Sequence, residues 1–169
     1  MNPNDVIECL GLVPLPVEGG LFRQTYLADD RVAQAHLPNR YISDKPFATA
    51  IYYFLTAELD SFSAMHRLPT DEIYHFYLGD PVEMLLLFPD GHTERVILGQ
   101  DILRGQKVQH IVPKNAWQGS RIIAGGRFAL MGTTMAPGYT EPDYEGGRAG
   151  KLFAQYPVQV EMIKQLTRS

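Results

Sequence analysis

The sequence contains a single cysteine, Cys9, so no disulfide can form within the chain and a reducing compartment is expected. It lacks an uninterrupted apolar run of about 18 residues, the length that a membrane span requires. Its first residues also lack the basic segment and apolar stretch of a secretory signal. We therefore expect a cytoplasmic protein that has no membrane partner.

Clustered basic charge is missing as well. The formal net charge is −4, and the chain has no basic run of four or more residues. Proteins that bind nucleic acid usually carry a basic patch or stripe. The composition thus predicts no nucleic-acid partner and favours a small-molecule ligand.

The length of 169 residues, with 45% hydrophobic and 20% charged residues, is typical of one globular domain. A chain of this size buries roughly 70% of the surface that it exposes when unfolded. Such a core needs neither a disulfide nor a structural metal. We predict a single domain that covers residues 1–169.

Short runs rich in aromatic and β-branched residues follow one another from Gly20 onward, separated by Gly, Pro and Asp. This pattern is typical of an all-β sandwich or barrel. The predicted strands are Leu21–Leu27, Ala48–Thr56, Phe62–His66, Glu72–Leu78, Val82–Phe88, Thr93–Leu98, Val108–Val112, Gln118–Ile123 and Arg127–Met135.

Helices are predicted only near the two ends of the chain. Asn2 can cap a short helix that begins at Pro3 and ends at Gly11. Near the other end, Pro157 can open a helix. The residues that share its apolar side would be Val158, Met162, Ile163 and Leu166. The predicted fold class is therefore mainly β, with short N- and C-terminal helices.

Three segments between strands carry further expectations. Residues 28–46 are polar and weakly periodic, which predicts a mobile loop near the mouth of the barrel. Asp90-Gly91 and Gly125-Gly126 lie between apolar runs, where tight turns with positive φ are expected. The strands on either side of each turn should therefore be antiparallel neighbours.

The segment from His66 to Gly79 carries the candidate site. Because alternate residues of a strand share a face, one strand should present its apolar face through Phe62, Ala64, His66 and Leu68. The opposite face would carry Ser61, Ser63 and Met65. The next strand should present Glu72, Tyr74, Phe76 and Leu78 inward, with His75 outward. His66 and Glu72 are thus predicted to converge in the interior.

This segment resembles the first cupin motif, in which His-x-His, three residues, Glu, six residues and Gly include three metal ligands. His66, Glu72 and Gly79 have the spacing of the motif, but Leu68 stands where the second His should be. The second cupin motif, Pro-x-Gly-x-x-His, would end at Gln118, which replaces its His. Two of the four ligand positions are therefore changed.

From about residue 10 to 157 the chain is similar to a small cupin family of unknown function. The family reads Glu-Gly-Gly, Ser-x-x-His, Asp-Glu, Gly-Asp-Pro, Pro-x-x-x-Trp and Ala-Pro-Gly. The matching residues here are Glu18-Gly19-Gly20, Ser63 with His66, Asp71-Glu72, Gly79-Asp80-Pro81, Pro113 with Trp117, and Ala136-Pro137-Gly138. The resemblance implies a single-domain RmlC-like jelly-roll barrel, akin to sugar-nucleotide epimerases, and commonly a homodimer.

A metal cofactor is possible but is not favoured by the residues present. Transition-metal sites use His or Cys ligands with carboxylate support, whereas His66, Glu72 and Gln118 offer one imidazole, one carboxylate and one amide. An equally weighted interpretation is that His66 and Glu72 form a hydrogen-bonded buried pair left from a metal-binding ancestor.

Metal-free acid–base chemistry is the sharper hypothesis. His66 would move a proton near neutral pH, oriented and made more basic by Glu72. Tyr52, Tyr74 or Tyr139 would be the complementary acid. The likeness to sugar epimerases suggests an epimerase- or isomerase-like reaction on a sugar or sugar-nucleotide, by analogy at the level of the fold.

Ligand binding without chemistry is the alternative. Trp117 and Gln118 pair an aromatic ring with an amide, as many sugar or heterocycle pockets do, although Trp117 would serve equally as a core residue. Tyr74 is predicted to line the same pocket. Arg23 alternates with aromatic residues and would either reach a carboxylate or phosphate of the ligand or form a surface ion pair.

Overall fold

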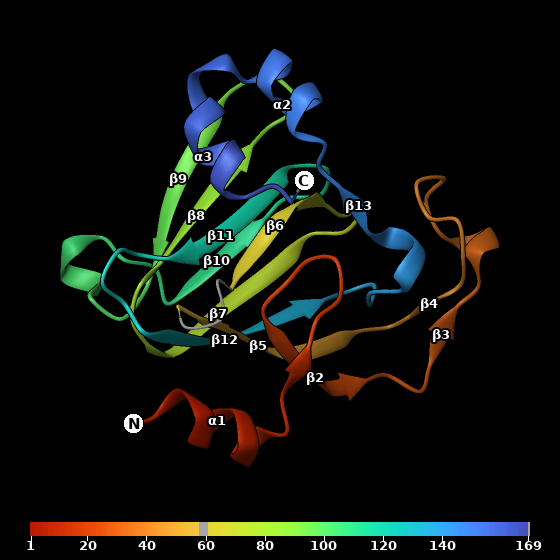
Figure 1. Ribbon diagram of the computed structural model, residues 1–169. Coiled ribbons are helices and arrows are strands. Elements are labelled where there is room, and N and C mark those ends of the chain that lie inside the picture. The colour runs from red at the N-terminus through yellow and green to blue at the C-terminus, as the bar shows by residue number, and fades with distance from the viewer. Residues whose placement is uncertain (58–60, 169) are drawn as a thin grey trace.

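Two antiparallel β-sheets packed face to face form the body of the protein (Figure 1). The computed structural model describes residues 1–57 and 61–168. The strands are β1 (Val13–Pro14), β2 (Leu21–Leu27), β3 (Arg31–Val32), β4 (Lys45–Pro46), β5 (Thr49–Thr56), β6 (Phe62–Arg67), β7 (Glu72–Gly79), β8 (Val82–Leu87), β9 (Thr93–Leu98), β10 (Gln109–Val112), β11 (Trp117–Ile122), β12 (Phe128–Met135) and β13 (Glu145–Gly146). The α-helices are α1 (Pro3–Leu10), α2 (Ala149–Gln155) and α3 (Val160–Gln165).

The strand order confirms the predicted jelly-roll fold class. The six-stranded sheet has the order β1-β2-β5-β12-β7-β10, and the five-stranded sheet has the order β13-β6-β11-β8-β9. Between β5 and β12 the chain passes repeatedly from one sheet to the other, as it does in a jelly roll. All nine strands predicted from the sequence are present, with their ends shifted by at most one residue.

The two predicted glycine turns have different outcomes. Asp90-Gly91 joins β8 and β9, which pair antiparallel in one sheet, so this prediction is confirmed. Gly125-Gly126 joins β11 to β12, which belong to different sheets, so the prediction that they are neighbours is wrong. A glycine turn permits a tight reversal of the chain, but it does not decide whether the next strand returns to the same sheet.

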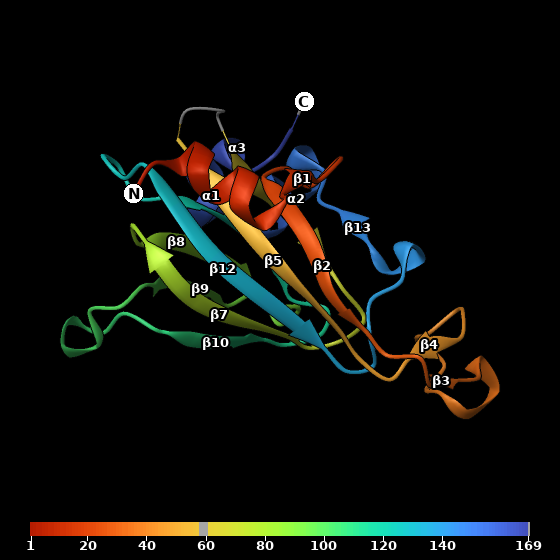
Figure 2. The same cartoon turned by 90° about the horizontal axis from the view of Figure 1, so that it is seen from below.

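The N-terminal helix α1 covers the outer face of the six-stranded sheet (Figure 2). The Asn2 side chain accepts a hydrogen bond from the Asn4 backbone at 3.0 Å, and Gly11 ends the helix with φ of 59°. These caps confirm the predicted helix. The buried residues of the cluster between the helix and the sheet are Val6, Leu12, Leu21, Phe54, Phe128 and Leu130.

The C-terminal segment packs on the outer face of the five-stranded sheet through two short helices (Figure 1). Met162, Ile163 and Leu166 are buried there, as predicted. Val158 is 80% exposed, so its predicted place on the apolar side is wrong. The reason is that residues 157–159 form a 3₁₀ turn and the α-helix begins only at Val160. Helix α2 has no counterpart among the predicted helices.

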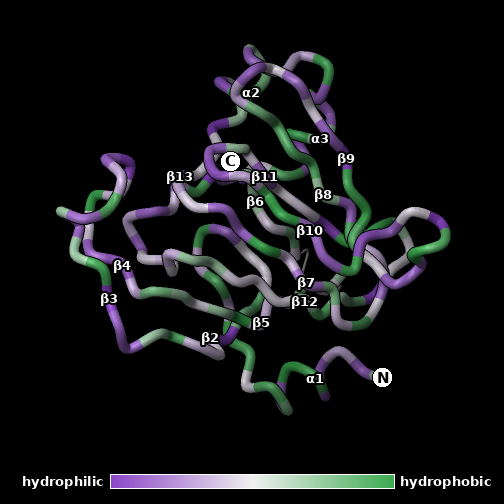
Figure 3. Tube along the Cα trace, turned by 180° about the vertical axis from the view of Figure 1, so that it is seen from behind, coloured by the Kyte–Doolittle hydropathy of each residue, from purple (hydrophilic) through white to green (hydrophobic). Residues whose placement is uncertain are grey.

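Residues 28–46, predicted as a loop, form an arm that contains short strands and a 3₁₀ turn. The arm contains the strand pair β3 and β4 and projects to one side of the two sheets (Figure 3). Tyr41 and Lys45 are almost completely buried. The Lys45 ammonium group contacts Asp143 and Thr140 and lies 5.5 Å from the centre of the Tyr41 ring. This buried ion pair joins the arm to the segment that precedes β13.

The interior between the sheets is filled at one end and hollow at the other. On β12, Ala129 and Met131 belong to the core, whereas Thr133 and Met135 face a cavity. On β7, Phe76 belongs to the same core, and Glu72 faces the cavity. The cavity therefore lies at the end of the sandwich where β12 finishes and β7 begins.

The face assignment of β7 was correct only up to Phe76. Leu78 packs in the cluster beneath α1, on the face opposite Phe76. The pairing of β7 with β12 passes from Phe76 with Met131 directly to Leu78 with Leu130, which leaves Tyr77 as a bulge. A bulge reverses the alternation beyond it.

Candidate functional site

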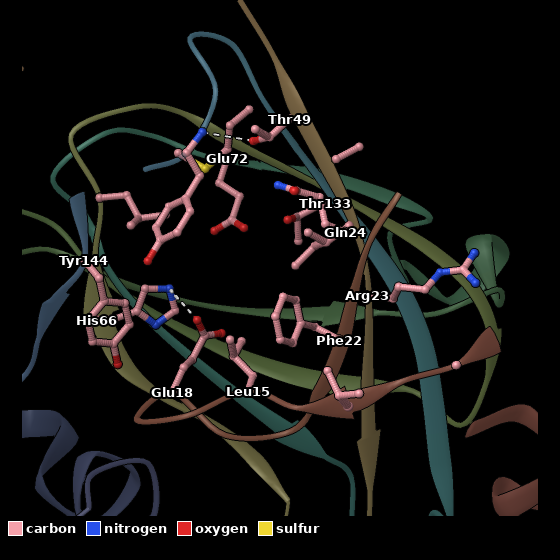
Figure 4. Close-up of a pocket in the computed structure, with 17 residues that line it drawn as sticks. Leu15, Glu18, Phe22, Arg23, Gln24, Thr49, His66, Glu72, Thr133 and Tyr144 are labelled. Atoms are coloured by element: carbon pink, nitrogen blue, oxygen red, sulfur yellow. Dashed lines mark hydrogen bonds and ion pairs between the residues drawn. The ribbon is translucent and has the colours of Figure 1, made fainter. Parts of the chain in front are cut away.

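A cavity of about 510 Å³ opens between the ends of the two sheets (Figure 4). Its walls come from the chain around β1, from β2, β5, β6, β7 and β12, and from the segment before β13. The lining residues are Gly11, Val13, Leu15, Glu18, Phe22, Arg23, Gln24, Thr49, Ala50, Ile51, His66, Leu68, Glu72, Thr133, Met135, Tyr139 and Tyr144. His66 and Glu72 thus lie in one cavity.

The His66 ring is held with one nitrogen toward the main chain and the other toward Glu18 at the cavity (Figure 4). Nδ1 lies 2.8 Å from the carbonyl oxygen of Ala64. Because a carbonyl oxygen can only accept a hydrogen bond, we assign the proton of the neutral ring to Nδ1. Nε2 then carries the lone pair, in a side chain that is only 2% exposed.

Glu18 brings a carboxylate close to this nitrogen. Its Oε2 lies 3.9 Å from Nε2 of His66, and its Oε1 accepts a hydrogen bond from the Ser63 hydroxyl at 2.9 Å. The Glu18 carbonyl also accepts a hydrogen bond from the backbone of Ala64 at 2.9 Å. The loop that carries Glu18 is therefore fastened to β6 at the position of His66.

Two glycines allow this loop to pass close to the strands. Gly19 has φ of +99° and Gly20 has φ of +72°, a region that favours glycine. A Cβ atom at Gly19 would lie 2.5 Å from the carbonyl oxygen of Phe62, and one at Gly20 would lie 2.9 Å from that of Phe54. The Glu-Gly-Gly sequence thus places the Glu18 carboxylate in the cavity.

Ser63 and His66 meet the same carboxylate, so the prediction that they face opposite sides of β6 is wrong. In the pairing with β11, His66 lies opposite Gln118 and Ser63 lies opposite Ser120, so two residues of β6 face Gly119 alone. This bulge turns residues three apart toward the same side. Phe62 consequently packs with Met65 in the outer cluster.

Glu72 is the second acidic group of the cavity. Burial raises the pKa of its carboxyl, and the charge of Glu18 adds to this rise, while the His66 charge opposes it. The Gln118 amide donates a hydrogen bond to Glu72 at 2.8 Å. Hydrogen bonding by Thr133 and Gln118 lowers this pKa and so opposes the effect of burial.

Gln118 supports Glu72 from behind rather than lining the cavity. It is 2% exposed, and its Oε1 has no hydrogen-bond partner within residues 1–57 and 61–168. Reversal of the amide would offer Oε1 to a protonated Glu72, whereas the present orientation offers Nε2 to the ionised form. Gln118 can therefore serve both protonation states of Glu72.

Trp117 lies outside the cavity, so it does not contact a ligand there. Neighbouring residues of a strand point to opposite faces, so Trp117 and Gln118 cannot both point inward. Trp117 packs against the cluster formed with α2 and α3, and the Arg67 guanidinium lies 4.6 Å from the centre of its ring. Among the predicted alternatives, its role as a packing residue agrees with this position.

Arg23 and Tyr74 also differ from their expected positions. The backbone region of Arg23 borders the cavity, but its guanidinium points away and lies 5.5 Å from the ring of Tyr52 on the outer face (Figure 4). Tyr74 is buried in the core behind Glu72 and does not line the cavity. Of the three tyrosines considered as acids, Tyr139 is the one that lines the cavity.

The sequence analysis missed Glu18 and Tyr144. The Tyr144 ring stacks on His66 with 5.2 Å between ring centres and 19° between planes. Neighbouring Tyr139 has its backbone amide bonded to Thr49 at 2.9 Å, and burial raises the pKa of its hydroxyl to about 12. The Glu-Gly-Gly sequence was the available signal for Glu18.

Comparison with known proteins agrees with this architecture. Residues 4–146 match the family described as Cupin superfamily (DUF985). The chain belongs to this family. A search of curated proteins gave no match. Within the part of the chain that the structure describes, no helix is long and apolar enough to span a membrane.

Two solved structures resemble this cupin over its whole length. A hypothetical protein from Leishmania major is 27% identical with a TM-score of 0.88, and the match covers 100% of both chains. A protein from Shewanella oneidensis is 30% identical with a TM-score of 0.84, and the match covers 99% of this chain and 98% of that one.

Oxalate decarboxylase from Bacillus subtilis shares the fold at greater distance. It is 13% identical with a TM-score of 0.52, and the match covers 92% of this chain but 37% of the enzyme. This likeness shows the fold alone. Mn(II) centres have been described in that enzyme.

The residues of this cavity do not fit a metal of that kind. Leu68 lines the cavity where the cupin motif has its second His, and the Gln118 amide is engaged with Glu72. Within the described residues, no three His, Cys, Asp or Glu side chains are grouped so that they could hold a metal ion. We therefore derive no chemical step through a metal.

Proposed function

We propose that this cupin binds a small organic molecule in the cavity and that His66 transfers a proton to and from it, as in an isomerase- or epimerase-like enzyme acting on a sugar derivative. The observation that carries the proposal is the orientation of His66. Its Nδ1 is engaged by the Ala64 carbonyl, which leaves the basic Nε2 directed toward Glu18 and the cavity. A general base needs this arrangement before any substrate arrives.

Glu18 supports proton transfer by stabilising the product of that step. When Nε2 takes up a proton, the ring becomes positive, and the Glu18 carboxylate 3.9 Å away attracts the charge. The two side chains are only 2% and 16% exposed, so water screens this attraction weakly. A separation of 3.9 Å can shorten to a hydrogen bond when a ligand excludes the remaining water.

Glu72 provides the matching acid. Its raised pKa favours a neutral carboxyl group, which can donate a proton or a hydrogen bond to a substrate oxygen. In an isomerisation, a C–H bond beside a carbonyl breaks and the proton moves to Nε2 of His66. The electron pair of that bond forms an enol or enolate, whose oxygen takes the hydrogen bond or proton of Glu72. When His66 returns its proton to the former carbonyl carbon, the hydroxyl on the neighbouring carbon becomes the new carbonyl and gives its proton to Glu72, so the isomer forms and both side chains are restored.

Deuterium exchange tests this proposal. Candidate aldoses and ketoses would be incubated with the protein in D₂O, and incorporation beside the carbonyl would be followed by NMR and mass spectrometry. We expect exchange with the unaltered protein and a loss of about 100-fold or more in His66→Asn. His75→Asn is the matched control, because His75 lies on the outer face and pairs with Thr134 at 3.2 Å.

Two results would count against the proposal. Equal exchange in His66→Asn and in the unaltered protein would remove His66 as the base. A ligand that occupies the cavity and never exchanges, across substrates with an acidic C–H bond, would favour a binding protein without chemistry. Melting temperatures of both variants separate loss of function from loss of folding.

A further inference from the structure

The charged groups that face the cavity carry one sign. Among the 17 lining residues, the acidic side chains are Glu18 and Glu72, and the only Lys or Arg is Arg23. Figure 4 shows the Arg23 guanidinium turned out of the cavity. The guanidinium lies 5.5 Å from the centre of the Tyr52 ring.

Two basic groups near the wall, Lys45 and Arg67, are already engaged. Lys45 contacts Asp143 and Thr140 in a buried ion pair. Arg67 forms two hydrogen bonds with Glu145, at 2.8 and 2.9 Å. Both charges are therefore matched by their own carboxylates and add little positive potential inside the cavity.

His66 does not reverse this balance. A protonated His66 ring faces the Glu18 carboxylate at 3.9 Å, so its positive charge is compensated locally. The other walls are apolar or aromatic, with Leu15, Phe22 and Ile51 among them. An anionic ligand would enter this space next to the Glu18 carboxylate, with no free basic side chain among the lining residues to attract it, and like charges repel strongly where water compensates weakly.

We infer that the cavity selects ligands without negative charge, namely neutral hydroxylated compounds and their amine-bearing analogues, and rejects phosphorylated, nucleotide-linked and carboxylate compounds. The inference rests on the proposed function and narrows its substrate from a sugar or sugar-nucleotide to an unphosphorylated sugar derivative. Hydroxyl or ammonium hydrogens can be donated to Glu18 and Glu72. The rings of Tyr139 and Tyr144 offer faces for the apolar side of the ligand and for an ammonium group.

Matched probes of different charge test the inference. One set is glucose, glucosamine, glucose 6-phosphate and gluconate, and a second is cyclohexanol, cyclohexylamine and cyclohexanecarboxylate. Binding would be titrated by NMR on protein with labelled methyl groups. Met135, Ile51 and Leu68 report on the cavity, while Met162 and Ile163 report on the distant cluster beneath the C-terminal helices.

We expect the neutral or amine probe of at least one set to shift the cavity methyl signals, with the anionic member binding roughly tenfold more weakly or worse. Glu18→Gln should narrow this difference by improving the binding of the anion. Glu83→Gln is the matched control, because Glu83 pairs with Arg121 and Arg95 on the outer face of β8, away from the cavity.

The possible results separate failure of the charge selection from failure of the proposed function. An anionic probe that binds in the cavity as tightly as its neutral counterpart would overturn the inference and leave a small-molecule pocket intact. Cavity methyl signals that respond to no probe of either set, at any accessible concentration, would contradict the proposed function and the inference with it. An unchanged difference in Glu18→Gln would remove Glu18 as the cause of the selection.

Discussion

Nε2 of His66 lies 3.9 Å from the carboxylate of Glu18, and this contact joins the two sheets of the protein. His66 belongs to β6 of the five-stranded sheet, whereas Glu18 belongs to the loop between β1 and β2 of the six-stranded sheet. The Glu-Gly-Gly and Ser-x-x-His sequences are far apart in the chain, but they meet at one carboxylate because Ser63 also binds Glu18.

The glycine that permits this contact gives the first prediction. Gly19→Ala should lower the free energy of unfolding by about 1–3 kcal/mol, because Ala at positive φ is strained and its Cβ would meet the Phe62 carbonyl. It should also weaken ligand binding, since Glu18 must move. Gly150→Ala in α2 is the matched control, because a Cβ there meets open space. Urea unfolding measures the stability of both variants. Equal stability of the two variants would contradict the close approach at Gly19.

Glu72 gives a prediction about pH. Its pKa is raised by burial above the ordinary value of 4.5, so the folded state retains this proton at a pH where the unfolded chain has lost it. The resulting contribution to stability is fully present below 4.5 and is lost as pH rises through the folded-state pKa. Glu72→Gln removes the titration. Its stability relative to the unaltered protein should therefore increase between pH 4 and pH 8, as followed by thermal unfolding.

The surface carboxyl of Asp90 provides a control of opposite sign. His92 lowers the pKa of Asp90 through a hydrogen bond, so any contribution of Asp90 to stability is lost as pH falls rather than as it rises. Asp90 is exposed, so Asp90→Asn should change the pH profile only slightly. A Glu72→Gln variant that becomes relatively less stable toward pH 8 would show that the buried carboxylate is ionised and stabilised.

The strands could be predicted from the sequence, but the faces of two of them could not. Runs of β-branched and aromatic residues between turn residues defined β2 and β9 to the residue. The alternation rule failed on β6, where a bulge opposite Gly119 turns Ser63 and His66 to one side. Such a bulge depends on the register with β11, which is a property of the pair and is not encoded in either strand alone.

The candidate site was predicted in part for a similar reason. His66 and Glu72 could be selected by the spacing of a motif that both residues still match. Glu18 could not be derived from periodicity, because it lies in a loop whose position is set by contacts with β6. Alternation puts Trp117 and Gln118 on opposite faces of β11, so the motif that contains both cannot place both in the cavity.

The buried ion pair between Lys45 and Asp143 gives a further prediction about the wall of the cavity. Both side chains are at most 2% exposed, and Asp143 lies next to Tyr144. Lys45→Met should destabilise the protein by about 3–5 kcal/mol, because an uncompensated carboxylate remains buried. The double variant Lys45→Met/Asp143→Leu should recover much of this loss. Chemical denaturation of the single and double variants measures the difference.

An exposed ion pair serves as the control for this experiment. Lys164 and Glu161 lie 2.9 Å apart with side chains that are 55% and 82% exposed. Lys164→Met should change stability by less than about 1 kcal/mol. If the double variant of the buried pair were no more stable than Lys45→Met, the loss would come from packing of the arm instead of from the unpaired charge.

The altered cupin motif gives the last prediction. Leu68 faces the cavity beside His66, and Gln118 pairs with His66 across β6 and β11. Replacing both in Leu68→His/Gln118→His would complete the set of three imidazoles and one carboxylate, a donor set suited to Zn²⁺ or Mn²⁺. We expect this variant to bind one equivalent of metal at least about tenfold more tightly than the unaltered protein, as measured by calorimetry. Adding His66→Asn should abolish the gain in metal affinity.

Stoichiometric metal in the unaltered protein, found by elemental analysis and lost in His66→Asn, would show instead that Leu68 and Gln118 have not removed the metal site. In that case Glu18 would be the residue to examine as the replacement ligand, because its carboxylate lies close to Nε2.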